Sequence, residues 1–178
     1  MIQILSKSIR IFFFGIIPLF ILVSGSNDEG EHPIPPQGTC QFKILGKTNL
    51  DGRGVATFRS ISERKAVDIE ENMLELTFEF SSGPTKKVIV FMVPQKLGQP
   101  TVAVGKYQIK NVERLFHGVE GIYGFADFGT QSELPYFVNK GTINILKNYD
   151  NKLVGRIETE FRNADEEILH VEGFFNAN

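Results

Sequence analysis

The chain contains no tryptophan, one cysteine and three histidines among its 178 residues. Because Cys40 is the sole cysteine, neither an intramolecular disulfide nor a metal site built on cysteines can form. Histidine-based zinc sites bring their ligands together at short spacing, whereas His32, His117 and His170 are scattered along the chain. We therefore predict no bound metal and no cofactor.

An excess of positive charge is missing as well. The formal net charge is −2, so the chain has no basic surplus to attract phosphate backbones, and we do not expect nucleic acid as a partner. No long amphipathic helical window stands out, which leaves strands as the expected elements. Phenylalanine, by contrast, is abundant at 16 residues, and this residue type suits a core built from strand faces.

The N-terminal 26 residues have the layout of a secretory signal peptide. Lys7 and Arg10 precede an apolar run over residues 11–23, and the small residues 24–26 end it. As a helix this run would span roughly 20 Å, which is short for a bilayer core of about 30 Å. We predict export to the periplasm, the outer-membrane surface or the medium. If the leader is retained, it would be the only part in contact with a membrane.

Residues 27–38 are polar and contain three prolines and two glycines, a composition that favours a tether over a helix or a central strand. Residues 39–178 then form the predicted folded domain. Apolar side chains recur at every second position there, as in the run Leu74, Leu76, Phe78 and Phe80. This alternation is typical of strands with one buried face.

The pattern predicts a single all-β domain, an antiparallel sandwich or flattened barrel of about nine to eleven strands. Residues 87–93 are apolar on both faces, so we expect a covered strand there. The last third of the chain forms a three-stranded meander with turns at 149–152 and 163–166. The expected strands cover residues 40–45, 55–60, 73–81, 87–93, 102–110, 118–128, 134–138, 141–145, 153–161 and 169–175.

The order of these cues resembles a group of small exported lipoproteins of Bacteroidetes-type bacteria. The matching motifs are a Gly-x-Tyr strand, a Gly-x-Ile-x-Ile strand, a strand with an internal glycine that ends in Phe, and a Gly-x-Phe finish. Ser26 stands where members carry the lipid-bearing cysteine. The resemblance implies an all-β fold in the cell envelope and carries over no functional residue. The residues that match are Gly105, Tyr107, Gly141, Ile143, Ile145, Leu153, Gly155, Phe161, Val171, Gly173 and Phe175.

Candidate catalytic groups are few. Glu158, Glu160 and Glu172 fall on the polar faces of two neighbouring strands, and carboxylates about 7 Å apart could serve glycoside hydrolysis. Arg156 and Arg162 alternate with them, which favours a solvated face balanced by cross-strand ion pairs.

Other nucleophile patterns are equally weak. Cys40 at the start of a strand favours a small core residue over a nucleophile, and the chain has no Gly-x-Ser-x-Gly elbow. Glycines 118, 121 and 124 are predicted to mark bends within a strand. We predict no catalytic residue and no enzyme activity.

Aromatic residues gather between Lys110 and Lys140, where they could line a groove for a ligand or fill the core. The candidate groove residues are Phe116, Tyr123, Phe125, Phe128, Tyr136 and Phe137.

Three functions remain open after the sequence. The favoured one is a non-enzymatic binding or scaffold module whose partner is a glycan, a small apolar ligand or another envelope protein. The second is a lipocalin-like carrier of a small hydrophobic ligand, for which twelve phenylalanines follow residue 26. The third is an envelope glycoside hydrolase acting through Glu158, Glu160 or Glu172.

Overall fold

The structure is a computed structural model that describes residues 33–46, 49–65, 69–82, 85–95, 102–109, 121–129 and 134–178. The predicted signal peptide and the first part of the predicted tether therefore lie outside the described residues. Residues 34–178 belong to one compact unit.

Every regular element of the described residues is a β-strand, so the predicted all-β class is confirmed. The part of the chain that the structure describes contains nine strands, at the lower end of the expected range. The strands are β1 (Thr39–Leu45), β2 (Leu50–Lys65), β3 (Ile69–Ser82), β4 (Thr85–Pro94), β5 (Gly105–Ile109), β6 (Tyr123–Asp127), β7 (Tyr136–Tyr149), β8 (Lys152–Arg162) and β9 (Ile168–Ala177).

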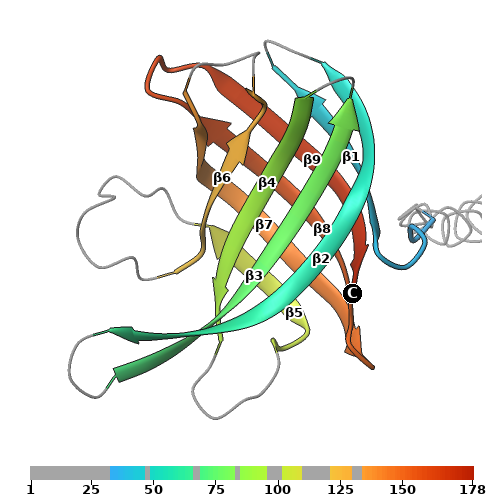
Figure 1. Ribbon diagram of the computed structural model, residues 1–178, viewed down its shortest axis with the longest axis vertical. Coiled ribbons are helices and arrows are strands. Elements are labelled where there is room, and N and C mark those ends of the chain that lie inside the picture. Colours follow the sequence, from blue (N-terminus) through green and yellow to red (C-terminus); the bar gives the residue numbers. More distant parts are fainter. Residues whose placement is uncertain are drawn as a thin grey trace, which may run out of the picture. The chain divides into compact units, whose positions relative to one another are not determined.

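All strands except β5 close into an antiparallel barrel (Figure 1). Each strand pairs with the next barrel strand along the chain, and β9 returns to pair with β1. β5 lies outside this circuit: it pairs with β7 over Gly141–Ile145, next to the shorter stretch of β7 that pairs with β6. The sequence left sandwich and barrel open, and the closing β7–β8 and β9–β1 pairs make this fold a barrel rather than two stacked sheets.

The C-terminal meander forms as predicted, with its first strand longer than expected. The sequence predicts separate strands over residues 134–138 and 141–145. In the structure, residues 136–138 and 141–145 all belong to the single strand β7. A bulge between Val138 and Lys140 explains the difference, because Asn139 is an extra residue that has no register partner on β8. It interrupts the polar–apolar alternation, which in the sequence is indistinguishable from the end of a strand.

The second strand also differs from the prediction. The sequence places a loop over residues 46–54, yet β2 begins at Leu50 and continues to Lys65. Asp51-Gly52 has the chemistry of a tight turn, but in the structure Gly52 and Gly54 are paired with β1. A Cβ at either glycine would stand within 3.0 Å of the Phe80 ring, so these glycines make room for a core side chain.

Phenylalanine rings fill the inside of the barrel. Six of them form one connected network, with ring centroids between 4.8 and 6.3 Å apart, and all six are fully buried. An eight-stranded barrel has an interior just wide enough for side chains to fill. Period-two alternation therefore builds a solid aromatic core between these strands. Its members are Phe42, Phe78, Phe80, Phe91, Phe161 and Phe175.

Inward-facing glycines provide the space for these rings. A glycine on one strand lies against a phenylalanine of the neighbouring strand, and an added Cβ would stand 2.5 to 3.0 Å from that ring. Since real Cβ contacts are longer, the glycines and the rings determine one another. The pairs are Gly52 and Gly54 with Phe80, Gly124 with Phe91, Gly155 with Phe175, and Gly173 with Phe42.

Candidate functional site

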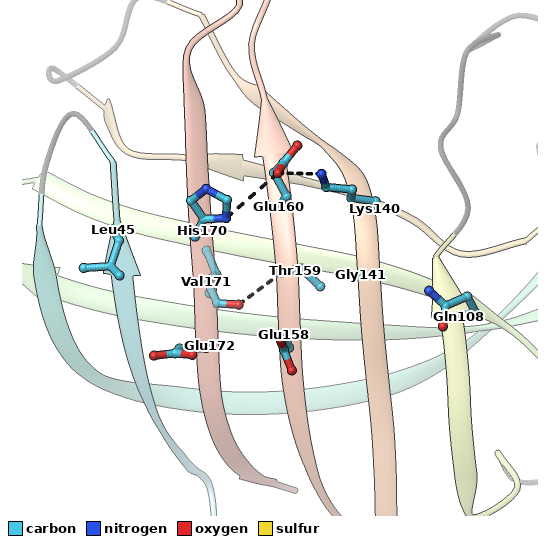
Figure 2. Close-up of a pocket in the computed structure, with 10 residues that line it drawn as sticks. All are labelled: Leu45, Gln108, Lys140, Gly141, Glu158, Thr159, Glu160, His170, Val171 and Glu172. Carbon is cyan, nitrogen blue, oxygen red and sulfur yellow. Dashed lines mark hydrogen bonds and ion pairs between the residues drawn. The ribbon is translucent and has the colours of Figure 1, made fainter.

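The outer face of the sheet is hollowed where β1, β5, β7, β8 and β9 lie together (Figure 2). The hollow has a volume of about 540 Å³ and is open to solvent. Its polar lining comes mainly from side chains that alternate with the buried ones on β8 and β9. The side chains that give it chemical character are Gln108, Lys140, Glu158, Glu160, His170 and Glu172. We call this the acidic hollow.

Cross-strand register brings the three predicted carboxylates into this one place. Glu158 on β8 stands directly opposite Glu172 on β9, and Glu160 stands opposite His170. Basic neighbours balance Glu158 and Glu172. The Arg156 guanidinium lies 3.9 Å from the Glu158 carboxylate, and the Lys43 ammonium on β1 lies 4.0 Å from the Glu172 carboxylate. The expected balanced polar face is what this part of the sheet contains.

Glu160 differs from the other two carboxylates because it is held by donors from β7. The bulge places the side chains of Asn139 and Lys140 next to one another, and both reach Glu160. The Asn139 amide donates at 3.0 Å, and the Lys140 ammonium lies 3.0 Å away. His170 approaches from the other side at 4.0 Å. Only 9% of the Glu160 side chain is exposed, although it lies on the outer face.

Gly141 allows this close approach of β7 to β8. Its φ of +135° is one that side-chain-bearing residues rarely adopt. A Cβ there would meet the Glu158 carbonyl oxygen and come within 2.6 Å of Thr159 Cα. The sequence identifies Gly141 only as part of a Gly-x-Ile-x-Ile strand, and it gives no signal for the bulge beside it.

The electrostatics of Glu160 fit an ion pair. Burial alone would raise the pKa of the Glu160 carboxyl. Hydrogen bonds from Asn139 and Lys140, together with the charges of Lys140 and His170, outweigh burial and hold that pKa below its usual value. A glycosidase needs one carboxylic acid that keeps its proton near neutral pH. Glu160 lacks that property.

The predicted aromatic groove is divided between the two faces of the sheet. Phe128 and Tyr136 point inward, with ring centroids 6.3 Å apart, and both are buried. Tyr123, Phe125 and Phe137 alternate with buried neighbours and point outward. The sixth candidate, Phe116, lies outside the described residues. Whether these residues bind a ligand stays a prediction.

On the outside, two of these residues form a cross-strand pair. Phe125 on β6 stands directly opposite Phe137 on β7, and 40% and 43% of their surfaces are exposed. Val90 on β4 stands opposite Phe125, while Arg162 on β8 stands opposite Phe137. We call Phe125 and Phe137 the outer aromatic row. In the sequence, the alternation of Tyr136, Phe137 and Val138 carries the signal for this row.

His170 and Cys40 have ordinary surroundings. His170 is exposed on β9, while His32 and His117 lie outside the described residues. Among the residues that the structure describes, no group of three or more His, Cys, Asp or Glu side chains is arranged to hold a metal ion. Cys40 is buried among core residues, and this burial raises the pKa of its thiol to about 12.

The closed pairing of eight strands defines the chain as an antiparallel β-barrel domain. Comparisons with protein-family models, curated proteins and solved structures found no match to it. Within the described ranges, no helix has the length and apolar character needed to span a bilayer.

Proposed function

We propose that the chain is an exported protein of the bacterial cell envelope and that its barrel is a non-enzymatic binding module. The proposed partner is another envelope protein, bound on the outer aromatic row. Export is supported by the leader pattern of residues 1–26. The absence of an enzymatic role is supported by the lowered pKa of Glu160 and the ion pairs around the acidic hollow.

The Phe125–Phe137 pair is the observation that carries the binding proposal. These two rings lie outside the buried core cluster, so the packing of the barrel interior does not depend on them. Their exposure keeps apolar surface in contact with water, which is unfavourable unless a partner covers it. A partner that buries both rings removes that cost.

The composition around the pair favours a protein partner. Met92 and Tyr123 flank the row on the same outer face as a cross-strand pair, and Arg162 borders it. Phenylalanine, tyrosine, methionine and arginine are the residue types enriched at the centres of protein interfaces. Small ligands bind in concave sites, whereas an exposed aromatic pair on the outside of a barrel suits a complementary protein surface.

Photo-crosslinking in the native host tests this proposal. A photoreactive amino acid replaces Phe137, and a matched control replaces Thr57, an exposed outward residue of β2. We expect one discrete protein adduct from position 137 and none from position 57. Adding Phe125→Thr to the position-137 variant should remove the adduct. Equal adducts from both positions, or none from either, would contradict the proposal, and fractionation of the same cells tests export.

A lipocalin-like carrier is the second candidate function. Its specific support is the closure of eight strands in up-and-down order, because barrels of this size can hold one small ligand. The filled aromatic core places such a ligand at an end of the barrel rather than between the six rings. An apolar ligand that raises the unfolding temperature in proportion to its concentration would support this alternative.

A further inference from the structure

The hairpin of β2 and β3 extends beyond the other strands of the barrel (Figure 1). β1 pairs with β2 only as far as Val55, and β4 pairs with β3 only from Met73 onward. Residues 59–65 of β2 therefore have β3 on one side and, within the part of the chain that the structure describes, no strand on the other. A strand with such a free edge offers its N–H and C=O groups to a further strand.

Backbone hydrogen bonds show where this edge becomes free. The Phe58 N–H donates to the Asn178 carbonyl oxygen at 3.3 Å, and the Asn178 N–H donates to the Ala56 carbonyl oxygen at 3.4 Å. Every second residue of a strand directs its backbone groups to the same side. Those of Ser60 and Ser62 therefore point to this side as well, where no described strand pairs with them.

The residue order along the free edge is self-complementary. The run Arg59-Ser60-Ile61-Ser62-Glu63 reads the same in both directions about Ile61, except that its ends carry opposite charges. When two copies lie antiparallel about Ile61, Ser60 of one stands opposite Ser62 of the other, and these residues exchange backbone hydrogen bonds. Arg59 then stands opposite Glu63 in a pair without such bonds, where side chains lie closer together.

The charges of the hairpin favour the same pairing. Glu63 stands opposite Glu71 of β3, and like charges directly opposite one another destabilise a sheet. The Arg59 side chain is 70% exposed and holds Glu75 with two N–H groups, at 2.8 and 3.0 Å. A guanidinium has five N–H donors, so Arg59 retains donors for a second carboxylate. A second copy brings this cation opposite Glu63, on the side away from Glu71.

We infer that the free edge of β2 is an interface between two copies of this chain, paired antiparallel about a two-fold axis at Ile61. Each copy contributes the same residues, as in other two-fold interfaces. Asn178 occupies the edge at Phe58, so the pairing covers residues 59–63 and leaves Thr57 outside it. Because this seam is short, the dimer should be weak and should depend on protein concentration. The inference goes beyond the proposed function and does not rest on it.

Charge exchange tests the pairing by analytical ultracentrifugation over a wide range of protein concentration. The unsubstituted protein should pass from monomer to dimer as the concentration rises. Arg59→Glu and Glu63→Arg each place like charges opposite one another twice, and each should weaken dimerisation about tenfold or more. An equal mixture of the two variants restores opposite charges at both places, so it should form a heterodimer about as tightly as the parent protein dimerises.

A matched control changes a charge away from this edge. Lys86→Glu breaks a comparable cross-strand ion pair, which joins Lys86 to Glu79 at 2.7 Å, and it should leave dimerisation unchanged. A protein that is monomeric at every concentration would overturn the interface. The same holds for a dimer that both charge variants leave unaltered, and for a mixture that does not associate.

A disulfide at the axis tests the register without altering the charges. Ile61→Cys places two thiols opposite one another in a pair whose Cα separation a disulfide can span. Oxidised glutathione should link this variant into a covalent dimer and should leave the control Thr57→Cys unlinked, while the native Cys40 is buried. Equal linking at both positions, or none at position 61, would overturn the pairing even if a charge variant fails to fold. None of these results alters the crosslinking expected at Phe137.

Discussion

Gly155 on β8 stands directly opposite Phe175 on β9, and a Cβ on Gly155 would lie 2.5 Å from the ring. The same Cβ would also stand 2.6 Å from the Asn144 carbonyl oxygen on β7. Strand glycines usually weaken a sheet, because they increase the entropy of the unfolded chain and pack nothing. Here the missing side chain is what admits a core ring.

We predict that Gly155→Ala destabilises the protein by about 1–3 kcal/mol, the usual cost of overpacking a filled core. Urea unfolding measures this change. If the space beside Phe175 were free, the same substitution would stabilise the protein by roughly 0.5–1 kcal/mol through the unfolded chain. The sign of the change therefore decides between the two. The double variant Gly155→Ala with Phe175→Leu should be destabilised by less than the sum of the two single variants, because the smaller leucine side chain relieves part of the clash.

The ion pair at Glu160 should make stability depend on pH in one direction. The folded protein holds the pKa of Glu160 below its ordinary value of 4.5. The stabilisation is therefore present above about pH 4.5 and is lost as the pH falls through the folded-state pKa. Glu160→Gln should cost about 1 kcal/mol at pH 7. Urea unfolding at pH 7 and in acid measures the difference, which should shrink as the pH falls.

The matched control for this prediction is Glu158→Gln, since 69% of the Glu158 side chain is exposed. Exposed ion pairs contribute little, so this variant should stay within about 0.5 kcal/mol of the unsubstituted protein. A Glu160→Gln variant as stable as the parent at pH 7 would show that Asn139 and Lys140 do not stabilise the carboxylate.

The Cys40 thiol should be unreactive in the folded protein. Burial raises its pKa from the ordinary 9.0 to about 12, although a backbone hydrogen bond from Gly54 opposes the shift. The thiolate is the reactive species, so labelling by a disulfide reagent at pH 8 should be slow until denaturant is added. The stabilisation from keeping the thiol neutral is complete below pH 9 and declines as the pH rises toward 12. Rapid labelling without denaturant would contradict this burial.

The alternation of the sequence predicted much of the fold. It identified the all-β class, the C-terminal meander and the four inward residues of β3, because a closed sheet must bury every second side chain. It failed where a residue breaks that rule: Asn139 in its bulge divided β7, and Gly52 and Gly54 resembled a turn. Each failure has a long-range cause, since the partners are Glu160 on β8 and Phe80 on β3.

For the candidate site, the sequence placed Glu158, Glu160 and Glu172 on one polar face, and the structure brings them into one hollow. It could not show that Glu160 alone is buried, because its donors come from a bulge on another strand. The aromatic content suggested one groove, whereas the alternation of side chains along β6 and β7 divides the rings between the two faces of the sheet. The alternation on β4 predicts that Lys87 faces inward. Two adjacent lysines at the start of a strand nevertheless look alike in the sequence.

The central claim is that alternation on β6 and β7 turns Phe125 and Phe137 outward while Ala126 and Val138 face the core. Because the only native cysteine is buried, single cysteines at these four positions can be labelled with maleimide one at a time. The account predicts rapid labelling at 125 and 137, and labelling at 126 and 138 that is limited by opening of the barrel. Uniform rates, or faster labelling at 126 and 138, would contradict it.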